Sequence, residues 1–385
     1  MTLRLTENGS AVAAALDAET AGALHRSGLV EATPAGPGRW SIRPVPMMVG
    51  AVRVGGTDVV VEPKTGVARL LFLLGHAANP GFRIEHVEGT ADLDPLAAVA
   101  EALSRQAARV LRDGILQGYV TREESLTVIR GRPRLADQWS RRPLLPIPIE
   151  VTHDDYSPDI TENRILRAAL RRAAAIPRLR WETRSRLLHL DSRLDGVTLP
   201  VPSAPISPWR ETRLNRRYIA ALRLAELVLR NQSVETLPGR TPIAAFVANM
   251  PTVFEDFVTT ALIEALRDRP GRTEAQYPTY LDEERRVPLR PDLLHLVGDR
   301  PVLVADAKYK TDARSNDHQQ MLAYCTIFAL KRGWLVYASG STPLAPRHIR
   351  NSDITITPVA LNLTASPADL LAQLAALAHR MWNEH

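Results

Sequence analysis

Apolar residues in the first part of the chain form one alternating segment and several helical ones. Valines alternate with other residues over 49–61, with Gly55-Gly56 between the two halves, which predicts a β-hairpin that turns at the glycines. Apolar positions three and four residues apart predict helices over 11–25, 67–76 and 93–116. Residues 1–145 are therefore expected to form a β-rich N-terminal domain that also contains helices.

The pattern changes twice further along the chain. Residues 161–230 are mainly helical in their periodicity, which predicts a helical connecting region over 146–242. Beyond it, amphipathic helices beginning near Pro251, Asp317 and Ser366 alternate with apolar runs typical of strands, at 293–297, 302–305, 334–337 and 354–356. A C-terminal domain over 243–385, with a central mixed sheet flanked by helices, follows from this order, and the fold class is mixed α/β (α+β).

Two of the apolar runs should pair as a hairpin that carries acidic residues at its open end. Gly298-Asp299-Arg300-Pro301 separates the runs and supplies turn-forming residues. A turn centred on Asp299 places Asp292 opposite Asp306, because the two lie equally far from it along the chain. Side chains alternate along a strand, so Lys308 should share a face with Asp306.

Paired carboxylates at that separation favour a bound cation. Without one, their repulsion would raise the pKa of one of them, and Lys308 alone does not satisfy both. Oxygen ligands without a Cys or His cluster are typical of Mg²⁺ or Mn²⁺ sites. Such an ion polarises a phosphodiester, and a lysine beside it orients a nucleophile or neutralises developing charge. The pattern predicts a metal-dependent phosphodiesterase, although Pro-Asp and Asp-x-Lys are each common surface features taken singly.

Two predicted helices bring further polar side chains to this region. Glu255 lies one residue away from the apolar stripe of the helix that starts at Pro251, and Gln320 and Tyr324 lie one turn apart on the helix that includes Asp317. Glu255 is a candidate catalytic carboxylate, with an ordinary solvated glutamate as the alternative. Gln320 is a candidate for contacting DNA or the Lys308 region.

The order of these motifs resembles the McrC family of PD-(D/E)xK nucleases, the nuclease subunits of McrBC-type modification-dependent restriction systems. The segments that carry the resemblance are Phe254-Glu255-x-Phe257, Pro291-Asp292, Asp306-Ala307-Lys308-Tyr309-Lys310 and Asp317-x-x-Gln320, with weaker similarity at 49–64 and 159–166. The resemblance implies a restriction-endonuclease-like C-terminal domain. It implies Asp292, Asp306, Glu255 and the backbone carbonyl of Ala307 as metal ligands, Lys308 as the catalytic lysine and Gln320 as a supporting catalytic residue.

The resemblance also implies a partner and a substrate. The chain lacks the Gly-x-x-x-x-Gly-Lys-Ser/Thr phosphate loop, so it is not expected to bind a nucleotide by that route. McrC-type subunits imply a separate McrB-like AAA+ GTPase ring, which moves double-stranded, modified DNA, and we expect residues 1–145 to dock on that ring. The alternatives are a stand-alone Mg²⁺ nuclease for damaged or branched DNA and a catalytically silent adaptor of an AAA+ motor.

Composition agrees with a cytoplasmic enzyme, and the net charge is compatible with a polyanionic partner without requiring one. Lys and Arg number 48 against 42 Asp and Glu, a net charge of +6, and arginines gather at 130–134, 141–142, 164–172 and 213–217. These arginines either contact phosphates or form solvated helix faces. The single cysteine, Cys325, excludes a disulfide framework, and no apolar run is long enough for a membrane span. We therefore expect a cytoplasmic protein without membrane contacts.

Overall fold

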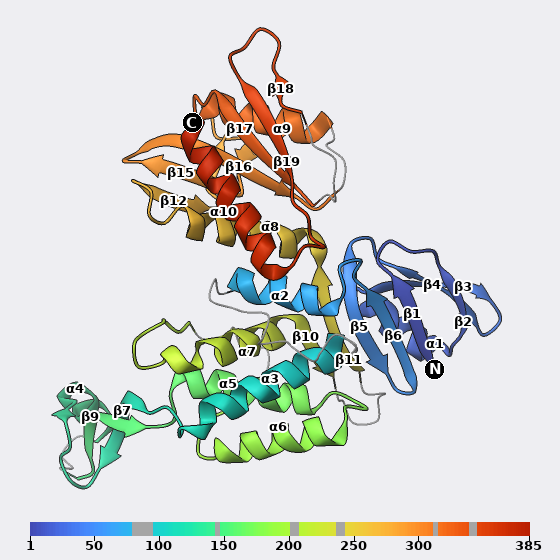
Figure 1. Cartoon of the computed structure of the whole chain (residues 1–385). Coiled ribbons are helices and arrows are strands. Elements are labelled where there is room, and N and C mark those ends of the chain that lie inside the picture. The colour runs from blue at the N-terminus through green and yellow to red at the C-terminus, as the bar shows by residue number, and fades with distance from the viewer. Residues whose placement is uncertain (79–94, 143–146, 201–207, 236–242, 311–314, 339–344) are drawn as a thin grey trace. The chain divides into compact units, whose positions relative to one another are not determined.

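The computed structural model describes residues 1–78, 95–142, 147–200, 208–235, 243–310, 315–338 and 345–385. The chain divides into two compact units (Figure 1). One unit joins Met1–Val99 to Asn231–His385, and the other contains Ala100–Arg230. The model confirms the expected mixed α/β fold class, with several sheets and helices in both units. None of the helices among the described residues is long and apolar enough to span a membrane.

The first unit begins with two small sheets. A three-stranded sheet has the order β2 (Val12–Ala15), β4 (Arg39–Pro44), β3 (Val30–Gly36). A five-stranded sheet has the order β1 (Thr2–Thr6), β6 (Thr57–Glu62), β5 (Met48–Val54), β11 (Ile243–Asn249), β10 (Gln232–Glu235). The predicted valine hairpin is confirmed as β5 and β6, and the predicted helix that follows it as α2 (Val67–Ala78).

The predicted helix over 11–25 was wrong in its first half. Residues 12–15 form strand β2, and helix α1 (Ala18–Arg26) begins only after Asp17, whose side chain accepts a hydrogen bond from the Thr20 backbone N–H. An N-terminal cap of this kind ends the extended segment and starts the helix. The small apolar residues before Asp17 are compatible with a helix or a strand. They form a strand here because they pair with β4.

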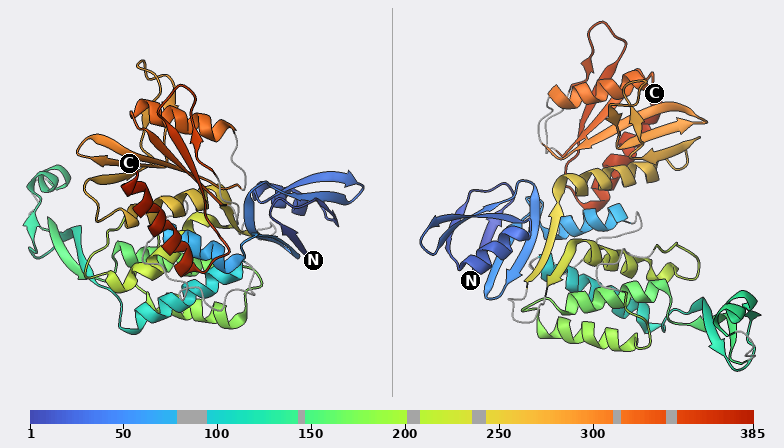
Figure 2. Two further views of the ribbon diagram at one scale, coloured as in Figure 1. Left: turned by 45° about the horizontal axis from the view of Figure 1, so that its top comes forward. Right: turned by 180° about the vertical axis from the view of Figure 1, so that it is seen from behind.

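The second unit is a helical bundle with a small sheet attached. Its helices are most of α3 (Pro95–Arg112), then α5 (Thr161–Ala174), α6 (Trp181–Arg193), the short 3₁₀ helix η2 (Arg216–Tyr218) and most of α7 (Ile219–Asn231). The sheet has the order β7 (Gly118–Leu126), β9 (Ile149–Ser157), β8 (Arg132–Pro133) and lies with helix α4 (Leu135–Arg141). Figure 2 shows this sheet projecting from the bundle in both views.

Both predicted segment boundaries interrupt paired strands. The boundary at 145 falls outside the described residues, but β7 and β9, which flank it, pair along their full length. The boundary at 242 separates β10 from β11, which pair with each other, and β11 also pairs with β5 near the start of the chain. Local periodicity does not reveal such long-range pairing, which explains the difference.

The rest of the first unit is built on a six-stranded mixed sheet. Its order is β12 (Arg272–Ala275), β15 (Leu293–Val297), β16 (Arg300–Lys308), β17 (Arg332–Tyr337), β19 (Thr355–Ala360), β18 (Arg347–His348). Strands β15 and β16 are antiparallel, whereas β16, β17 and β19 are parallel. A separate hairpin consists of β13 (Thr279–Tyr280) and β14 (Pro288–Leu289).

Helices cover both faces of this sheet (Figures 1 and 2). Helix α9 (Ser315–Ile327) packs Met321, Tyr324 and Cys325 against a core that includes Leu335 of β17. The next residue back, Trp334, faces the other way and stacks with Arg380 of α10 (Pro367–Asn383). Helix α8 (Met250–Ala265) contacts both α10 and β16. The expected sheet flanked by helices is therefore confirmed.

Candidate active site

The β15–β16 hairpin brings two acidic residues together. Leu293 pairs with Ala305, and the register continues unchanged to His295 and Leu303 before a bulge shifts it towards the turn. The pairing predicted from the turn therefore holds at the open end of the hairpin, where Asp292 precedes β15 and Asp306 lies in β16. The bulge affects only the pairs nearest the turn.

Asp292 is held in place by hydrogen bonds to both of its carboxylate oxygens. The backbone N–H of Ala307 donates to Oδ2 at 2.8 Å, and Gln276 Nε2 donates to Oδ1 at 2.6 Å. Asp292 is only 7% exposed. Gln276 was not predicted from the sequence, because it lies in the connection after β12 and carries no motif of its own. The backbone N–H of Gln276 also donates to the Asp292 backbone carbonyl at 3.0 Å. Gln276 therefore holds both the side chain and the main chain of Asp292.

Asp306 and Lys308 share one face of β16, as the alternation predicts. Lys308 Nζ forms an ion pair with Oδ2 of Asp306, which is 2% exposed. Among the described residues, no donor other than Lys308 reaches this buried oxygen. Burial raises the pKa of Asp306 well above its usual range, and the nearby charge of Asp292 raises it further, whereas Lys308 opposes both effects.

Lys308 remains a cation in this environment. Burial favours its neutral form, but the charges of Asp306, Asp292 and Glu255 outweigh that effect and raise the pKa of the ammonium group. A protonated lysine beside two buried carboxylates is suited to holding a phosphate oxygen rather than to removing a proton.

Glu255 of α8 lies within electrostatic reach of this group. Burial, and then the charge of Asp292, raise the pKa of Glu255 to about 7, while Lys308 lowers it. The apolar stripe of α8 explains the position of this helix, since Phe254 and Phe257 on either side of Glu255 are fully buried. Glu255 itself is half-buried, which favours the candidate catalytic carboxylate over an ordinary solvated glutamate, and its role stays a prediction.

Gln320 reaches the site through Tyr324 of the same helix. Gln320 Nε2 donates to the Tyr324 hydroxyl at 2.8 Å. Burial raises the pKa of that hydroxyl, and the charges of Asp306 and Asp292 raise it further. No hydrogen bond between Gln320 and Lys308 occurs within the described residues. The structure thus places four of the predicted side chains in one electrostatic cluster and connects Gln320 to it indirectly.

The donor set fits a hard divalent cation in its chemistry. Three carboxylates and one ammonium group leave two negative charges uncompensated when all are ionised, and among the described residues the buried Asp306 Oδ2 atom has no partner other than Lys308. Among the described residues, no three His, Cys, Asp or Glu side chains are arranged closely enough to hold a metal by themselves. Asp292, Asp306 and the Ala307 carbonyl are the groups that would hold a cation, with Glu255 nearby. This ligand set stays a prediction.

Comparison with solved structures agrees with the fold. This chain aligns with a structure described as the refined half-complex from a tetradecameric assembly of Thermococcus gammatolerans McrB AAA+ hexamers with bound McrC, at 18% identity and a TM-score of 0.61. The alignment covers 99% of this chain and 100% of that one. A second structure, described as the cryo-EM structure of the Thermococcus gammatolerans McrBC complex, aligns at 18% identity over 69% of this chain and 88% of that one, with a TM-score of 0.43.

No curated protein matches the sequence. The family model for the McrBC 5-methylcytosine restriction system component matches residues 45–338, which include every predicted site residue. The match spans most of the chain, and it confirms the family expected from the motifs. This chain therefore belongs to the McrBC 5-methylcytosine restriction system component family.

Proposed function

We propose that this protein is the McrC-type nuclease subunit of a restriction complex and that it hydrolyses DNA phosphodiesters with the help of Mg²⁺. The observation that carries the proposal is the buried Asp292–Asp306 pair with Lys308 on the same strand and Glu255 beside it. Uncompensated buried charge destabilises the native state, so a cluster of this kind is expected where it has a function.

Each side chain has a role that follows from its surroundings. A divalent cation bound by the acidic pair would supply Lewis-acid polarisation of the scissile phosphodiester. Asp292 is fixed by Ala307 and Gln276, so its carboxylate keeps its position when substrate enters. Lys308 carries the positive charge that neutralises charge developing on the phosphate. Glu255, with a pKa of about 7, exchanges a proton near neutral pH.

We further propose that an AAA+ GTPase of the McrB type activates this chain. Two observations support the partner: membership of the McrBC family, and structural similarity to a chain from an assembly of McrB AAA+ hexamers with bound McrC. The lack of a phosphate-loop motif in the sequence agrees with a motor on a separate chain. The N-terminal sheets are the proposed docking element, through which this chain would stimulate the partner's hydrolysis of GTP.

The test is plasmid cleavage by the purified chain with Mg²⁺, alone and with its McrB-type partner plus GTP or ATP, on methylated and unmethylated DNA. Cleavage that needs the partner, GTP and methylated DNA supports the proposal. Cleavage by the chain alone would instead identify a stand-alone nuclease. Absence of cleavage combined with stimulated GTP hydrolysis would identify a silent adaptor.

A further inference from the structure

Positive charge is distributed unequally between the two units. Residues 100–230 contain 24 arginines, no lysine and 15 acidic residues, a net charge of +9. The other unit keeps the remaining 24 of the 48 cationic and 27 of the 42 acidic residues, a net charge of −3, although it carries the candidate active site. Attraction for a polyanionic substrate therefore has to come mainly from the helical unit.

Many arginines of the helical unit are committed to ion pairs inside it. Arg167 and Arg171 both pair with Asp191, and Arg164 pairs with Asp159. Several exposed arginines differ: within the described ranges, they make no ion pair or side-chain hydrogen bond. Four of them come close together in the chain's fold, namely Arg109 and Arg112 in the last turn of α3, and Arg213 and Arg216 before α7.

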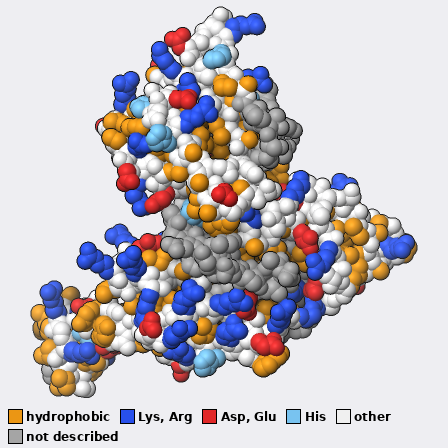
Figure 3. Space-filling model, viewed as in Figure 1, with side chains coloured by type: hydrophobic (Ala, Val, Ile, Leu, Met, Phe, Trp, Pro, Cys, Tyr) orange, Lys and Arg blue, Asp and Glu red, His pale blue; other side chains and the backbone are white. Residues whose placement is uncertain are grey.

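These four arginines lie at one end of the bundle, because hydrogen bonds tie the segments that carry them. Arg217, next to Arg216, donates to the carbonyl of Gly114, two residues after Arg112, at 2.8 Å. The Leu116 backbone N–H donates to the Tyr218 hydroxyl at 3.0 Å. In Figure 3, Lys and Arg side chains are frequent on the face of this unit that is in view. We call the cluster of Arg109, Arg112, Arg213 and Arg216 the arginine patch.

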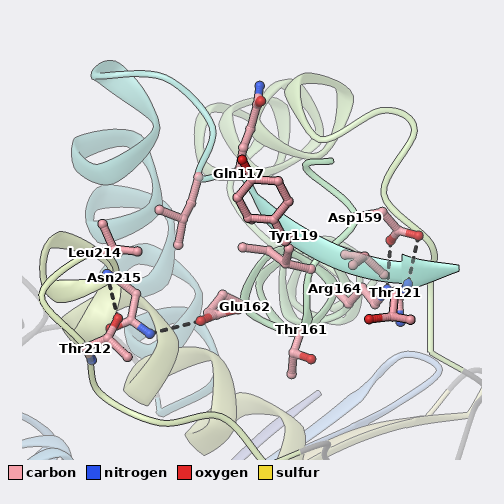
Figure 4. Close-up of a pocket in the computed structure, with 14 residues that line it drawn as sticks. Gln117, Tyr119, Thr121, Asp159, Thr161, Glu162, Arg164, Thr212, Leu214 and Asn215 are labelled. Carbon is pink, nitrogen blue, oxygen red and sulfur yellow. Dashed lines mark hydrogen bonds and ion pairs between the residues drawn. The ribbon is translucent and has the colours of Figure 1, made fainter. Parts of the chain in front are cut away.

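A cavity of about 460 Å³ lies beside the patch, and its described lining residues offer polar surface but no free cation. Figure 4 shows the polar side chains that line it and the hydrogen bond between Asn215 and Glu162. Asn215 donates to Glu162 at 2.9 Å, and Arg164 donates to Asp159 at 2.7 Å. Tyr119 lines the cavity and is 78% exposed. Arg164 compensates Asp159, whereas Glu162 keeps its negative charge, since its partner Asn215 is neutral. A bound anion would therefore be held by the arginine patch at the rim rather than by the cavity.

We propose that the arginine patch binds the phosphate backbone of double-stranded DNA, as a surface separate from the candidate active site. Arginine presents several N–H donors in a fixed planar arrangement that matches phosphate oxygens, and it stays charged at every physiological pH. The unpaired state of these side chains means that binding breaks no existing ion pair. This inference rests on the proposed function only in taking DNA as the ligand.

The experiment measures DNA binding without cleavage, so that its outcome is independent of nuclease activity. The full chain is titrated onto a fluorescent DNA duplex in EDTA, and the dissociation constant is determined by anisotropy at several salt concentrations. Arg213→Ala and Arg216→Ala, singly and together, are the test variants, because Arg109 and Arg112 also stabilise the C-terminus of α3. Arg180→Ala is the matched control, an exposed arginine just before α6 at the opposite end of the bundle.

We expect the double variant to bind several-fold more weakly at low salt. Its slope of log affinity against log salt should fall by about 0.9 for each phosphate that the variant no longer neutralises. Arg180→Ala should match the unmodified chain in affinity and slope. Equal slopes for the double variant, Arg180→Ala and the unmodified chain would overturn the proposal, as would no binding by the unmodified chain at low salt. Binding that depends on the patch in a chain that cuts no DNA would retain this proposal and reject only the nuclease function.

Discussion

At the scale of single residues, Glu255 and Asp306 are acids that burial and neighbouring charge hold partly protonated near neutral pH. The pKa of Glu255 rises from 4.5 to about 7 on folding. At a pH between these two values, Glu255 is mostly protonated in the native state and mostly ionised in the unfolded chain. The unfolded chain binds fewer protons over this range, and the free energy of unfolding therefore falls as the pH rises from about 4.5 to about 7.

This linkage predicts a metal-dependent pH effect. In EDTA, the Tm of the unmodified chain should fall more steeply from pH 5 to pH 8 than that of Glu255→Gln, which cannot ionise. Mg²⁺ should raise the Tm more at pH 8 than at pH 5, because it stabilises ionised carboxylates. Glu283→Gln, at an exposed glutamate, is the control and should follow the unmodified chain. Parallel pH profiles for Glu255→Gln and the unmodified chain would contradict the electrostatic explanation of this residue.

The residues of the site were predictable to different degrees. Asp292, Asp306 and Lys308 follow from hairpin register and alternation, because both depend on a short stretch of sequence. Gln276 was not predictable in the same way, since its role depends on where the chain after β12 runs. The sequence placed Gln320 and Tyr324 on one helix face, but only the structure shows that Gln320 donates a hydrogen bond to the Tyr324 hydroxyl.

At the scale of elements, strand β5 depends on a close backbone approach at Gly50. Its φ is +143°, and a Cβ added there would lie 1.9 Å from the Phe246 carbonyl oxygen of β11. Strand β11 lies at the start of the predicted C-terminal domain, whereas β5 lies in the predicted N-terminal domain. This contact therefore joins distant parts of the chain. The valine hairpin was predictable because its pairing is local, whereas the partner on its other edge was not.

Gly50→Ala should therefore destabilise the protein strongly, by about 3 kcal/mol or more, because either the backbone or the neighbouring strand has to move. Urea unfolding of the purified chain measures the effect. Gly56→Ala, in the turn of the same hairpin, meets no atom within 4 Å and should change the free energy of unfolding by less than about 1 kcal/mol. Similar losses for the two variants would contradict the close-approach explanation.

At the scale of the whole molecule, a single buried carboxylate links the N-terminal sheet to the strand that carries Lys308. Glu7, which is 3% exposed, accepts a hydrogen bond from the Tyr309 hydroxyl at 3.1 Å and another from the Lys64 backbone N–H at 3.3 Å. Tyr309 follows Lys308 directly and contacts the ring of Phe254, the neighbour of Glu255. The Glu7–Tyr309 hydrogen bond therefore ties the N-terminal sheet to the residue next to Lys308.

Tyr309→Phe removes this link with little change in shape. We expect it to lower the free energy of unfolding by about 1 to 2 kcal/mol, because a buried carboxylate loses a donor. A double-mutant cycle with Glu7→Gln should show coupling between the two positions. Tyr280→Phe, at an exposed tyrosine, should have little effect. Strictly additive effects at positions 7 and 309 would mean that the hydrogen bond does not contribute to stability.

The most direct test of the central claim compares two Asp→Asn substitutions on one hairpin, in the complex with the McrB-type partner, GTP and Mg²⁺. Asp306 is buried in the candidate site, whereas the Asp299 side chain is 97% exposed at the turn. We expect Asp306→Asn to abolish DNA cleavage while the protein stays folded and still stimulates GTP hydrolysis, and we expect Asp299→Asn to cleave normally. Cleavage by Asp306→Asn at the rate of the unmodified complex would show that the acidic pair is not the nuclease site.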